Sequence, residues 1–468
     1  MDFILFSLAL LLWLCAGCGA VLLIAPRGRA MSLIEVLSLA VLLGAATISF
    51  ALFCLGFGLS GLALRSAVTV LCLVLGGAGW ARQRRSLIKI AWPSRPSITD
   101  CFFLSVLVIQ TSFVVWLSLR NTFGWDGLFN WESKAHLACI NSGVIPLQYF
   151  SDPSRAWSHP EYPLFLPLTQ SWFYSWLGSC HQGLIKLIFP PFYLSGLGLL
   201  YVSGSRMGGS RLHGWLPAMM LPFVPLAIFR DGSATSGYAD FPLAVCYLAA
   251  AIYVAEYWKS GASDALRLTA CLSALLPWVK QDGTILWLVI AVLIAVKGVA
   301  RKQLKGPLAA IMPGLLVALS WIVFVRVVKA PFMDAFLPVR PATLWAHLDR
   351  WPPVVKAMYS EMADWTHWSL MWPGLLLALP LTRSAERRAQ VVALLTAVIA
   401  PVILYSWVYV FSSLQYMEHV TSSLSRLLLQ VTPVAVLILG LSIPRYRARD
   451  SETPTRTQTA KDEHRRNA

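Results

Sequence analysis

The sequence concentrates its ionisable side chains in one long polar segment between apolar runs. Segment 120–163 is the longest polar interruption in the first three quarters of the chain, and it holds Asp126, Glu132, Lys134, His136, Asp152, Arg155, His159 and Glu161. Carboxylates and histidines can transfer protons, and lysines and arginines can stabilise an anion. Polar groups are costly in lipid and are tolerated where they face water or a cavity. This segment is therefore the first candidate for a reaction site.

Shorter polar segments elsewhere extend this candidate site. They cover 230–240 (RDGSATSGYAD), 280–283 (KQDG) and 412–426 (SSLQYMEHVTSSLSR), and the longer segment 329–366 is a further element. A charged residue at the end of a membrane span is often only an anchor. Several such segments on one side of a membrane, opposite loops of plain arginine and lysine, instead indicate a water-facing site.

Composition shows which elements must position these residues. Hydrophobic residues make up 57% of the chain and charged residues 13%, and there are 20 tryptophans. This is typical of an all-α polytopic membrane protein and excludes an ordinary soluble enzyme. The formal net charge is +16, but lysine and arginine occur in short clusters between apolar runs. That distribution sets membrane topology and does not indicate a nucleic-acid partner.

Hydropathy and basic loops predict how the spans are arranged. We expect about thirteen transmembrane helices, near 3–25, 33–53, 62–80, 101–119, 183–204, 215–229, 238–258, 267–280, 283–298, 307–328, 368–382, 391–411 and 424–442. The basic segments 81–97, 206–214, 299–306 and 383–390 are expected in the cytoplasm by the positive-inside rule. Segment 120–163 and the N-terminus then lie outside.

Stretch 162–178 is apolar but is not expected to span the membrane. A full span there would invert every later loop, and the stretch carries prolines and many aromatic residues. We therefore interpret it as re-entrant or interfacial.

The chain divides into three expected regions. They are an N-terminal three-span extension with a basic cytoplasmic loop (1–98), a transmembrane catalytic domain with its large outer loop (99–443), and a basic, disordered cytoplasmic tail (444–468). The expected location is the plasma membrane, specifically the bacterial inner membrane, with the site on the extracytoplasmic side.

The nine cysteines show no paired spacing that would make a zinc site, and most lie inside apolar runs. Cys139 and Cys180 face the outside in this topology and could form a disulfide. The favoured interpretation is two unrelated thiols.

Several short motifs occur in a recognisable order. They are Trp125-Asp126, WESKA at 131–135, HPEYP at 159–163, GYAD at 237–240, KQDG at 280–283 and Ser425-Arg426 at the start of a late span. This order resembles the GT-C superfamily of integral-membrane glycosyltransferases, particularly the branch of protein O-mannosyltransferases and lipid A aminoarabinose transferases. The resemblance covers about residues 101–433. The chain departs from it in the three extra spans in front, and in Gly127, where many relatives place an acidic residue.

The resemblance implies a polyprenyl-phosphate-linked sugar as donor and a glycan, lipid or protein hydroxyl as acceptor, with membrane lipid as a further partner. Asp126 matches the proposed base, which deprotonates the acceptor hydroxyl. The remaining residues fall into two sets: donor-phosphate ligands, and residues that orient the sugar or the acceptor. The first set is His159, Arg426, Lys280 and Lys134, and the second is Asp240, Asp282, Glu132, Trp131 and Tyr162. No cofactor is certain, and the lack of an acidic pair beside Asp126 argues against an obligatory divalent metal.

Each of these residues also has a structural interpretation. Asp126 could cap a helix, because aspartate is a favoured N-cap residue. Arg426 and the lysines could extend to the membrane interface as anchors. Asp240 and Asp282 could merely pair with Lys280. Most of the tryptophans suit an aromatic belt at the membrane interface.

Two other functions remain open. A secondary transporter or a flippase for a lipid-linked or anionic substrate would carry its charges along a midplane pathway, and it tends to show two similar halves, which this chain lacks. A polymerase or ligase of O-antigen type also uses lipid-linked sugars outside the membrane, but would be expected to rely on large outer loops later in the chain.

Overall fold

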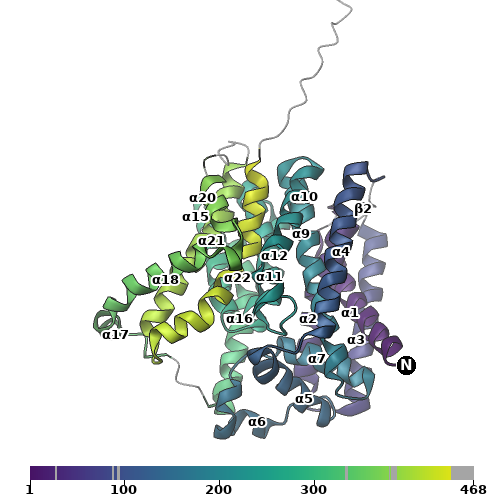
Figure 1. Ribbon diagram of the computed structural model, residues 1–468. Coiled ribbons are helices and arrows are strands. Elements are labelled where there is room, and N and C mark those ends of the chain that lie inside the picture. Colours follow the sequence, from purple (N-terminus) through teal and green to yellow (C-terminus); the bar gives the residue numbers. More distant parts are fainter. Residues whose placement is uncertain are drawn as a thin grey trace, which may run out of the picture.

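The computed structural model describes residues 1–26, 29–86, 89–91, 95–331, 336–378, 380 and 387–443. The expected tail 444–468 and parts of the basic segments 81–97 and 383–390 lie outside the described residues. The described chain is almost entirely helical, and its long helices run roughly parallel to one another (Figure 1). This confirms the expected all-α class.

Ten described helical segments are long and apolar enough to cross a membrane, so the chain is a multi-pass membrane protein. They are α1 (Asp2–Ile24), α2 (Leu33–Leu55), α3 (Gly61–Ser86), α4 (Ile98–Arg120), α8 to α9 (Gln182–Gly208), α12 (Asp240–Ser260), α15 (Gly283–Ala300), α16 (Lys305–Val327), α21 (Arg388–Val408) and α22 (Tyr416–Ser442).

In the part of the chain that the structure describes, three of the expected spans contain shorter helices. Stretch 215–229 contains α10 (Arg211–Met220), η4 (Leu221–Phe223) and α11 (Leu226–Phe229), and stretch 267–280 contains α13 (Ser263–Ser273) and α14 (Leu276–Val279). In stretch 368–382, α20 covers Met371–Ala378, after the short α19 (Trp365–Trp368). Prolines at the start of η4 and of α14 remove backbone donors, which explains the first two interruptions. The count of about thirteen crossings stays a prediction.

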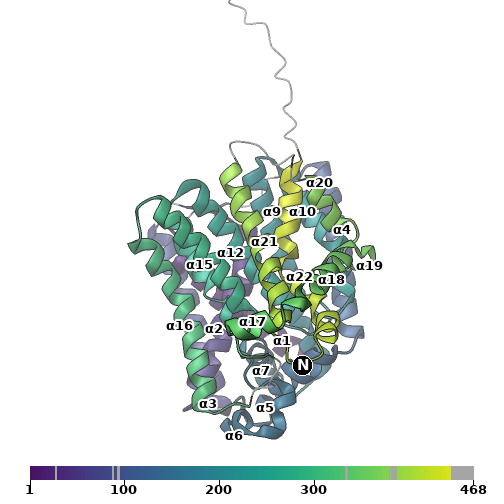
Figure 2. The same cartoon turned by 90° about the vertical axis from the view of Figure 1, so that its left-hand side faces the viewer.

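Helix α12 lies at the centre of the bundle. Nearly all of its residues are buried, and α9, α13, α21 and α22 pack around it (Figure 2). The first three helices join the same body, because Ser195 of α9 donates a hydrogen bond to the carbonyl of Ser38 in α2 at 2.8 Å. The strands β1 (Ala30–Ser32) and β2 (Lys89–Ala91) form one short parallel pair.

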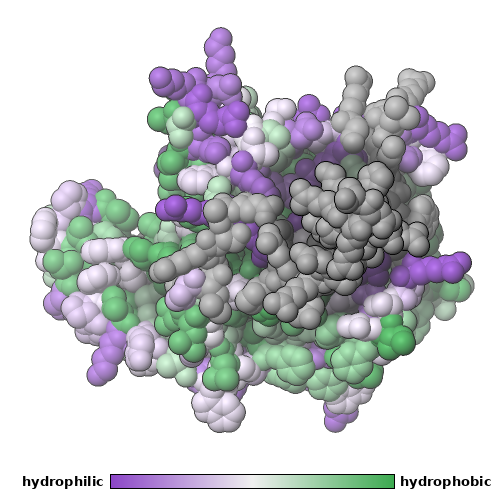
Figure 3. Space-filling view, turned by 90° about the horizontal axis from the view of Figure 1, so that it is seen from above, coloured by the Kyte–Doolittle hydropathy of each residue, from purple (hydrophilic) through white to green (hydrophobic). Residues whose placement is uncertain are grey.

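The two ends of the bundle carry different chemistry. At one end Arg387 donates to the carbonyls of Gly208 and Leu441, and His213 donates to the carbonyl of Ile443. Basic segment 206–214 therefore lies beside the end of α22, and hydrophilic side chains gather on this face (Figure 3). At the opposite end Gly61 donates to the carbonyl of Ser142, so the long polar segment lies at the start of α3. Basic segment 206–214 and the long polar segment thus lie at opposite ends of the bundle, as expected.

The long polar segment folds into a cap of short helices at that opposite end. They are η1 (Gly127–Glu132), α5 (Ser133–Ile140), α6 (Leu147–Ser151) and η2 (Pro153–Ser158), followed by the buried α7 (Phe165–Leu177). Helix α7 has 13 residues. It is therefore about 20 Å long, too short to cross a hydrocarbon core of about 30 Å.

A disulfide ties this cap to the bundle. Cys139 of α5 is bonded to Cys180, just before α8. The favoured interpretation of two unrelated thiols was therefore wrong. The two cysteines are 41 residues apart in the sequence, and α7 turns the chain back so that their Cα atoms lie 6.0 Å apart.

Residues 336–366 include a projecting arm of short helices, α17 (Pro341–Ala346), η5 (Leu348–Arg350) and α18 (Trp351–Ala363) (Figure 1). Arg350 donates to the carbonyl of Ser412 at 2.7 Å, and Trp351 donates to Ser406 at 3.1 Å. These contacts hold the arm against η7 (Tyr409–Phe411) and the end of α21.

Candidate functional site

Asp126 and Arg426 meet across the site. Arg426 lies in the third turn of α22, and its guanidinium donates to the carboxylate of Asp126. Asp126 stands at the start of η1, a π-helix, but its side chain makes no capping hydrogen bond. π-Helical turns are rare and frequently occur at functional sites. The carboxylate is therefore used for the ion pair and not for the cap that the sequence also allowed.

Tyr238 holds both members of this pair in place. Its hydroxyl accepts a hydrogen bond from the backbone N–H of Asp126 at 3.1 Å. The guanidinium of Arg426 lies over the Tyr238 ring, 5.3 Å from its centre. Tyr238 belongs to the GYAD motif, but only Asp240 was singled out there. The sequence signal that could have identified Tyr238 was its position two residues before Asp240 in the same motif.

The backbone around Asp126 packs too tightly for a side chain at the next position. A Cβ atom on Gly127 would lie 2.5 Å from the carbonyl oxygen of Ser236. On Gly124 it would lie 2.5 Å from the ring of Tyr238. The close approach of the two segments leaves room only for glycine at these two positions.

Lys280 forms the second charged group, between two carboxylates. Its ammonium is 2.8 Å from Asp240 and 2.7 Å from Asp282. Burial lowers the pKa of Lys280, but the two carboxylates outweigh burial and raise this pKa above its usual value. Burial likewise raises the pKa of Asp282, and the pairing with Lys280 brings it below its usual value. Lys280 and Asp282 are therefore both charged at neutral pH.

Gln430 joins these carboxylates to the helix that carries Arg426. Its amide donates to Asp240 at 3.0 Å and to Asp282 at 3.1 Å, and its carbonyl accepts from the hydroxyl of Tyr405 at 2.7 Å. Gln430 is fully buried. Sequence reasoning missed it, although it lies one helical turn after Arg426 as an isolated amide in an apolar run.

The two charged groups are neighbours. A Cβ atom on Gly232 would lie 3.1 Å from Cγ of Arg426 and 3.4 Å from Cβ of Asp240. We call the set Asp126, Asp240, Lys280, Asp282 and Arg426 the ion-pair cluster. It contains three carboxylates and two cations, and its members come from the long polar segment and from α12, α15 and α22 or the turns that precede them.

His419 extends the polar face of α22 toward the end of the bundle. It lies two helical turns before Arg426, and its Nδ1 is 3.0 Å from the hydroxyl of Ser412. Between them, Ser423 is 2.9 Å from the hydroxyl of Tyr409. The sequence predicted that segment 412–426 belongs to the site, but it gave a role only to Arg426.

Lys134 and His159 form a separate group beside the cluster. The Lys134 ammonium donates to the carbonyl of His159 at 2.7 Å, and the His159 ring lies 2.8 Å from Glu161 and stacks on Tyr162. Lys134 is fully buried, and burial lowers its pKa to about 7, although Glu161 acts in the opposite direction. In this structure these two predicted phosphate ligands fix the turn at 159–163.

Tyr162 lies between this group and the ion-pair cluster. Burial raises the pKa of the Tyr162 hydroxyl. The positive charge of Lys280 lowers this pKa and the negative charge of Asp282 raises it, so both charges influence the Tyr162 hydroxyl. Trp131 packs on Tyr162 with ring centres 5.7 Å apart. Glu132, by contrast, accepts a hydrogen bond from Tyr174 of α7 at 2.8 Å. The structure therefore packs Tyr162 against Trp131 and His159, within reach of the charges of Lys280 and Asp282, and turns Glu132 toward α7.

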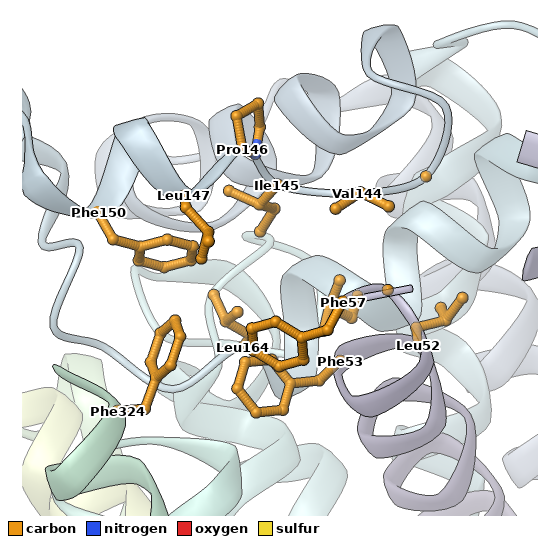
Figure 4. A pocket seen from close by; sticks show the side chains of 13 residues that line it. Leu52, Phe53, Phe57, Val144, Ile145, Pro146, Leu147, Phe150, Leu164 and Phe324 are labelled. Atoms are coloured by element: carbon orange, nitrogen blue, oxygen red, sulfur yellow. The ribbon is translucent and has the colours of Figure 1, made fainter. Parts of the chain in front are cut away.

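An apolar cavity of about 140 Å³ lies under the cap (Figure 4). Its walls come from the end of α2, from segment 143–150 and from Phe324 of α16. Figure 4 shows Phe53, Phe57, Phe150 and Phe324 around it. It would suit a hydrocarbon group.

No family model, curated protein or solved structure matches the chain. Among the residues that the structure describes, no three histidine, cysteine, aspartate or glutamate side chains are placed to hold a metal ion. The assignment of a function therefore depends on the ion-pair cluster itself.

Proposed function

We propose that this protein is a membrane glycosyltransferase that moves a sugar from a polyprenyl-phosphate donor to an acceptor hydroxyl on the extracytoplasmic face of the bacterial inner membrane. The observation that carries the proposal is the pair of Asp126 and Arg426. It puts a partly exposed carboxylate, suited to be a base, beside a guanidinium suited to hold phosphate.

The reaction is a single displacement. Asp126 takes the proton of the acceptor hydroxyl. At the same time, the oxygen of that acceptor hydroxyl forms a bond to the anomeric carbon of the sugar. The bond from that carbon to the phosphate oxygen breaks, and its electron pair stays on the phosphate, where Arg426 stabilises the charge. One displacement inverts the anomeric configuration.

Donor binding and base activation are linked through the same pair. A guanidinium beside a carboxylate favours the charged carboxylate and lowers its basicity. When the donor phosphate binds Arg426, it competes with Asp126, which then becomes a better base. Lys280 already lies between two carboxylates, so we assign it to holding Asp240 and Asp282 toward the sugar or the acceptor.

Three further observations support the expected side of the membrane and the lipid donor. The disulfide between Cys139 and Cys180 suits an oxidising compartment, as outside the inner membrane. The apolar cavity beside segment 143–150 suits part of an isoprenoid chain. The basic segments at the opposite end suit the cytoplasm.

The test compares cells with and without the gene. Mass spectrometry of polyprenyl-phosphate sugars and cell-envelope glycans should show the donor accumulating and one glycan losing a sugar when the gene is deleted. Purified protein should then transfer that sugar to the acceptor in detergent. Movement of the donor across liposomes without any transfer would instead identify a flippase, and unchanged lipids and glycans in the deletion strain would remove the proposal.

A further inference from the structure

A second cavity, separate from the ion-pair cluster, lies where α3, α7 and the end of α5 meet. Its volume is about 230 Å³, and its polar lining includes Arg65, Ser142, Ser171 and Ser175. None of its lining residues belongs to the ion-pair cluster. It is at the same end of the bundle as the cap, because Ser142 follows α5.

Arg65 supplies a positive charge that is not neutralised. It lies in the second turn of α3, donates to the carbonyl of Ser175 at 2.7 Å and stacks over the Trp176 ring at 5.3 Å. Among the described residues no carboxylate is within ion-pair distance of it. A guanidinium has five N–H donors, so one backbone carbonyl leaves most of them for a ligand. An ionisable residue inside a membrane span is a functional candidate by default.

Ser171 gives a second, independent indication of a ligand. It is 1% exposed, lines this cavity, and its hydroxyl has no hydrogen-bond partner among the described residues. Buried hydroxyls in native structures almost always have a partner. Ser171 and Ser175 lie one helical turn apart on α7, so both face the cavity that contains the Arg65 guanidinium.

We propose that this cavity binds the phosphate of a membrane phospholipid head group, with Arg65 and Ser171 as its ligands. Arginine binds phosphate oxygens with two parallel hydrogen bonds, and a serine hydroxyl donates a third. This site does not depend on the proposed transfer reaction.

The surroundings favour a lipid over free phosphate as the source of the anion. Arg65 is inside a span, and Leu62 at the cavity is 67% exposed and faces what would be lipid. Gly143 lines both this cavity and the apolar cavity of Figure 4. A polar pocket that borders an apolar one suits a molecule with a phosphate and a hydrocarbon chain.

Bound lipid would also support the cap. The cavity wall includes Cys139 at the end of α5 and Tyr174, whose hydroxyl holds Glu132 at the end of η1. Occupancy therefore stabilises the segment that carries Asp126, through Cys139 and Tyr174.

The experiment measures binding of phosphatidylglycerol to the purified full chain by native mass spectrometry, with and without millimolar inorganic phosphate. Arg65→Gln should weaken binding about tenfold or more, because it removes a charge-assisted contact. Arg120→Gln is the matched control: Arg120 ends α4 at the same end of the bundle and stacks on Trp116 at 5.7 Å, but lines neither cavity. It should bind as the native chain does.

Ser171→Ala keeps the test decisive even if Arg65→Gln fails to fold. Removing a buried hydroxyl that lacks a partner should leave the melting temperature in lipid-free detergent unchanged or higher, while lipid binding weakens severalfold. Equal binding by native, Arg65→Gln and Ser171→Ala chains would overturn the site, as would unchanged binding by folded Ser171→Ala alone. Full displacement of the lipid by inorganic phosphate would overturn the assignment to a lipid.

Discussion

Asp126 and Arg426 form an ion pair although they are 300 residues apart in the sequence. The pair closes the site between the first polar segment and α22, and it neutralises both groups while no donor is bound. If Asp126 is the base and Arg426 the phosphate ligand, as proposed, their direct contact makes donor binding and proton transfer interdependent.

Asp126→Asn should keep the fold and donor binding but lower turnover by about a hundredfold or more, because the amide preserves shape and loses basicity. Donor affinity should stay the same or rise, since Arg426 loses its competing carboxylate. Turnover and donor affinity on the purified chain check both effects. Asp152→Asn is the control, because Asp152 lies in the same segment and, among the described residues, its carboxylate contacts Arg155 and Ser154 and no member of the ion-pair cluster. Near-normal turnover of Asp126→Asn would exclude Asp126 as the base.

Arg426→Ala should weaken donor binding by roughly ten- to hundredfold, as expected for a charge-assisted contact of about 1.5 to 3 kcal/mol. Arg426→Lys should retain part of the affinity, because lysine keeps the charge and loses the planar fork. Arg155→Ala, which removes an exposed arginine of the same cap, should have no effect. If folded Arg426→Ala binds and turns over donor normally, Arg426 is only an anchor.

Gly127→Ala should destabilise the protein by about 1 to 3 kcal/mol, because the new methyl group would overlap the backbone oxygen of Ser236 and push η1 away. Thermal unfolding in detergent measures this change. A Cβ atom on Gly58 would meet nothing within 4 Å, so Gly58→Ala is a matched control that should change little. Equal melting temperatures for the two variants would mean that segments 124–127 and 236–238 are not in close contact.

The sequence predicted the fold class and the positions of the long spans because hydropathy over about 20 residues is a strong signal. It did not predict the interruptions before α11 and α14, since a hydropathy average does not register Pro222 or Pro277. Their short helices nevertheless end close to Arg230 and Lys280, which brings polar backbone segments to the site. Irregular backbone at membrane depth is tolerated where it is buried in protein.

At the site, sequence order and sidedness were enough to select Asp126, Asp240, Lys280, Asp282 and Arg426 together. The individual pairings were not predictable, because they depend on how distant helices pack. Gln430 was missed because a single amide in an apolar run is not by itself a signal of a functional residue. The disulfide was missed because cysteine connectivity cannot be deduced from sequence alone.

Labelling of single introduced cysteines should establish which end of the bundle faces outward. In a chain whose free cysteines are replaced by alanine, Ser154→Cys in the cap should react with a membrane-impermeant maleimide on intact spheroplasts. Gln303→Cys, in the turn between α15 and α16 at the opposite end, should react only after lysis. The reverse pattern would invert the whole arrangement and move the ion-pair cluster to the cytoplasmic side.

Reducing the disulfide should loosen the cap without unfolding the bundle. Cys180→Ser should lower the stability of the chain by about 2 to 4 kcal/mol, through the greater freedom of the unfolded segment. Melting with and without dithiothreitol measures this, and Cys101→Ser at an exposed free thiol is the control. If dithiothreitol leaves the native chain's melting temperature unchanged and thiol titration finds Cys139 and Cys180 reduced, the disulfide does not form.

Arg426 and Gln430 belong to α22, which follows every other described helix in the chain. During biosynthesis the carboxylates at positions 126, 240 and 282 therefore enter the membrane before the residues that complete their pairing. A nascent chain, or one cut short by a premature stop codon before α22, retains Lys280 between its two acids but leaves Asp126 without its arginine. Such a product lacks the ion pair on which the proposed reaction depends, and it carries an unpaired carboxylate where the complete chain has a salt bridge.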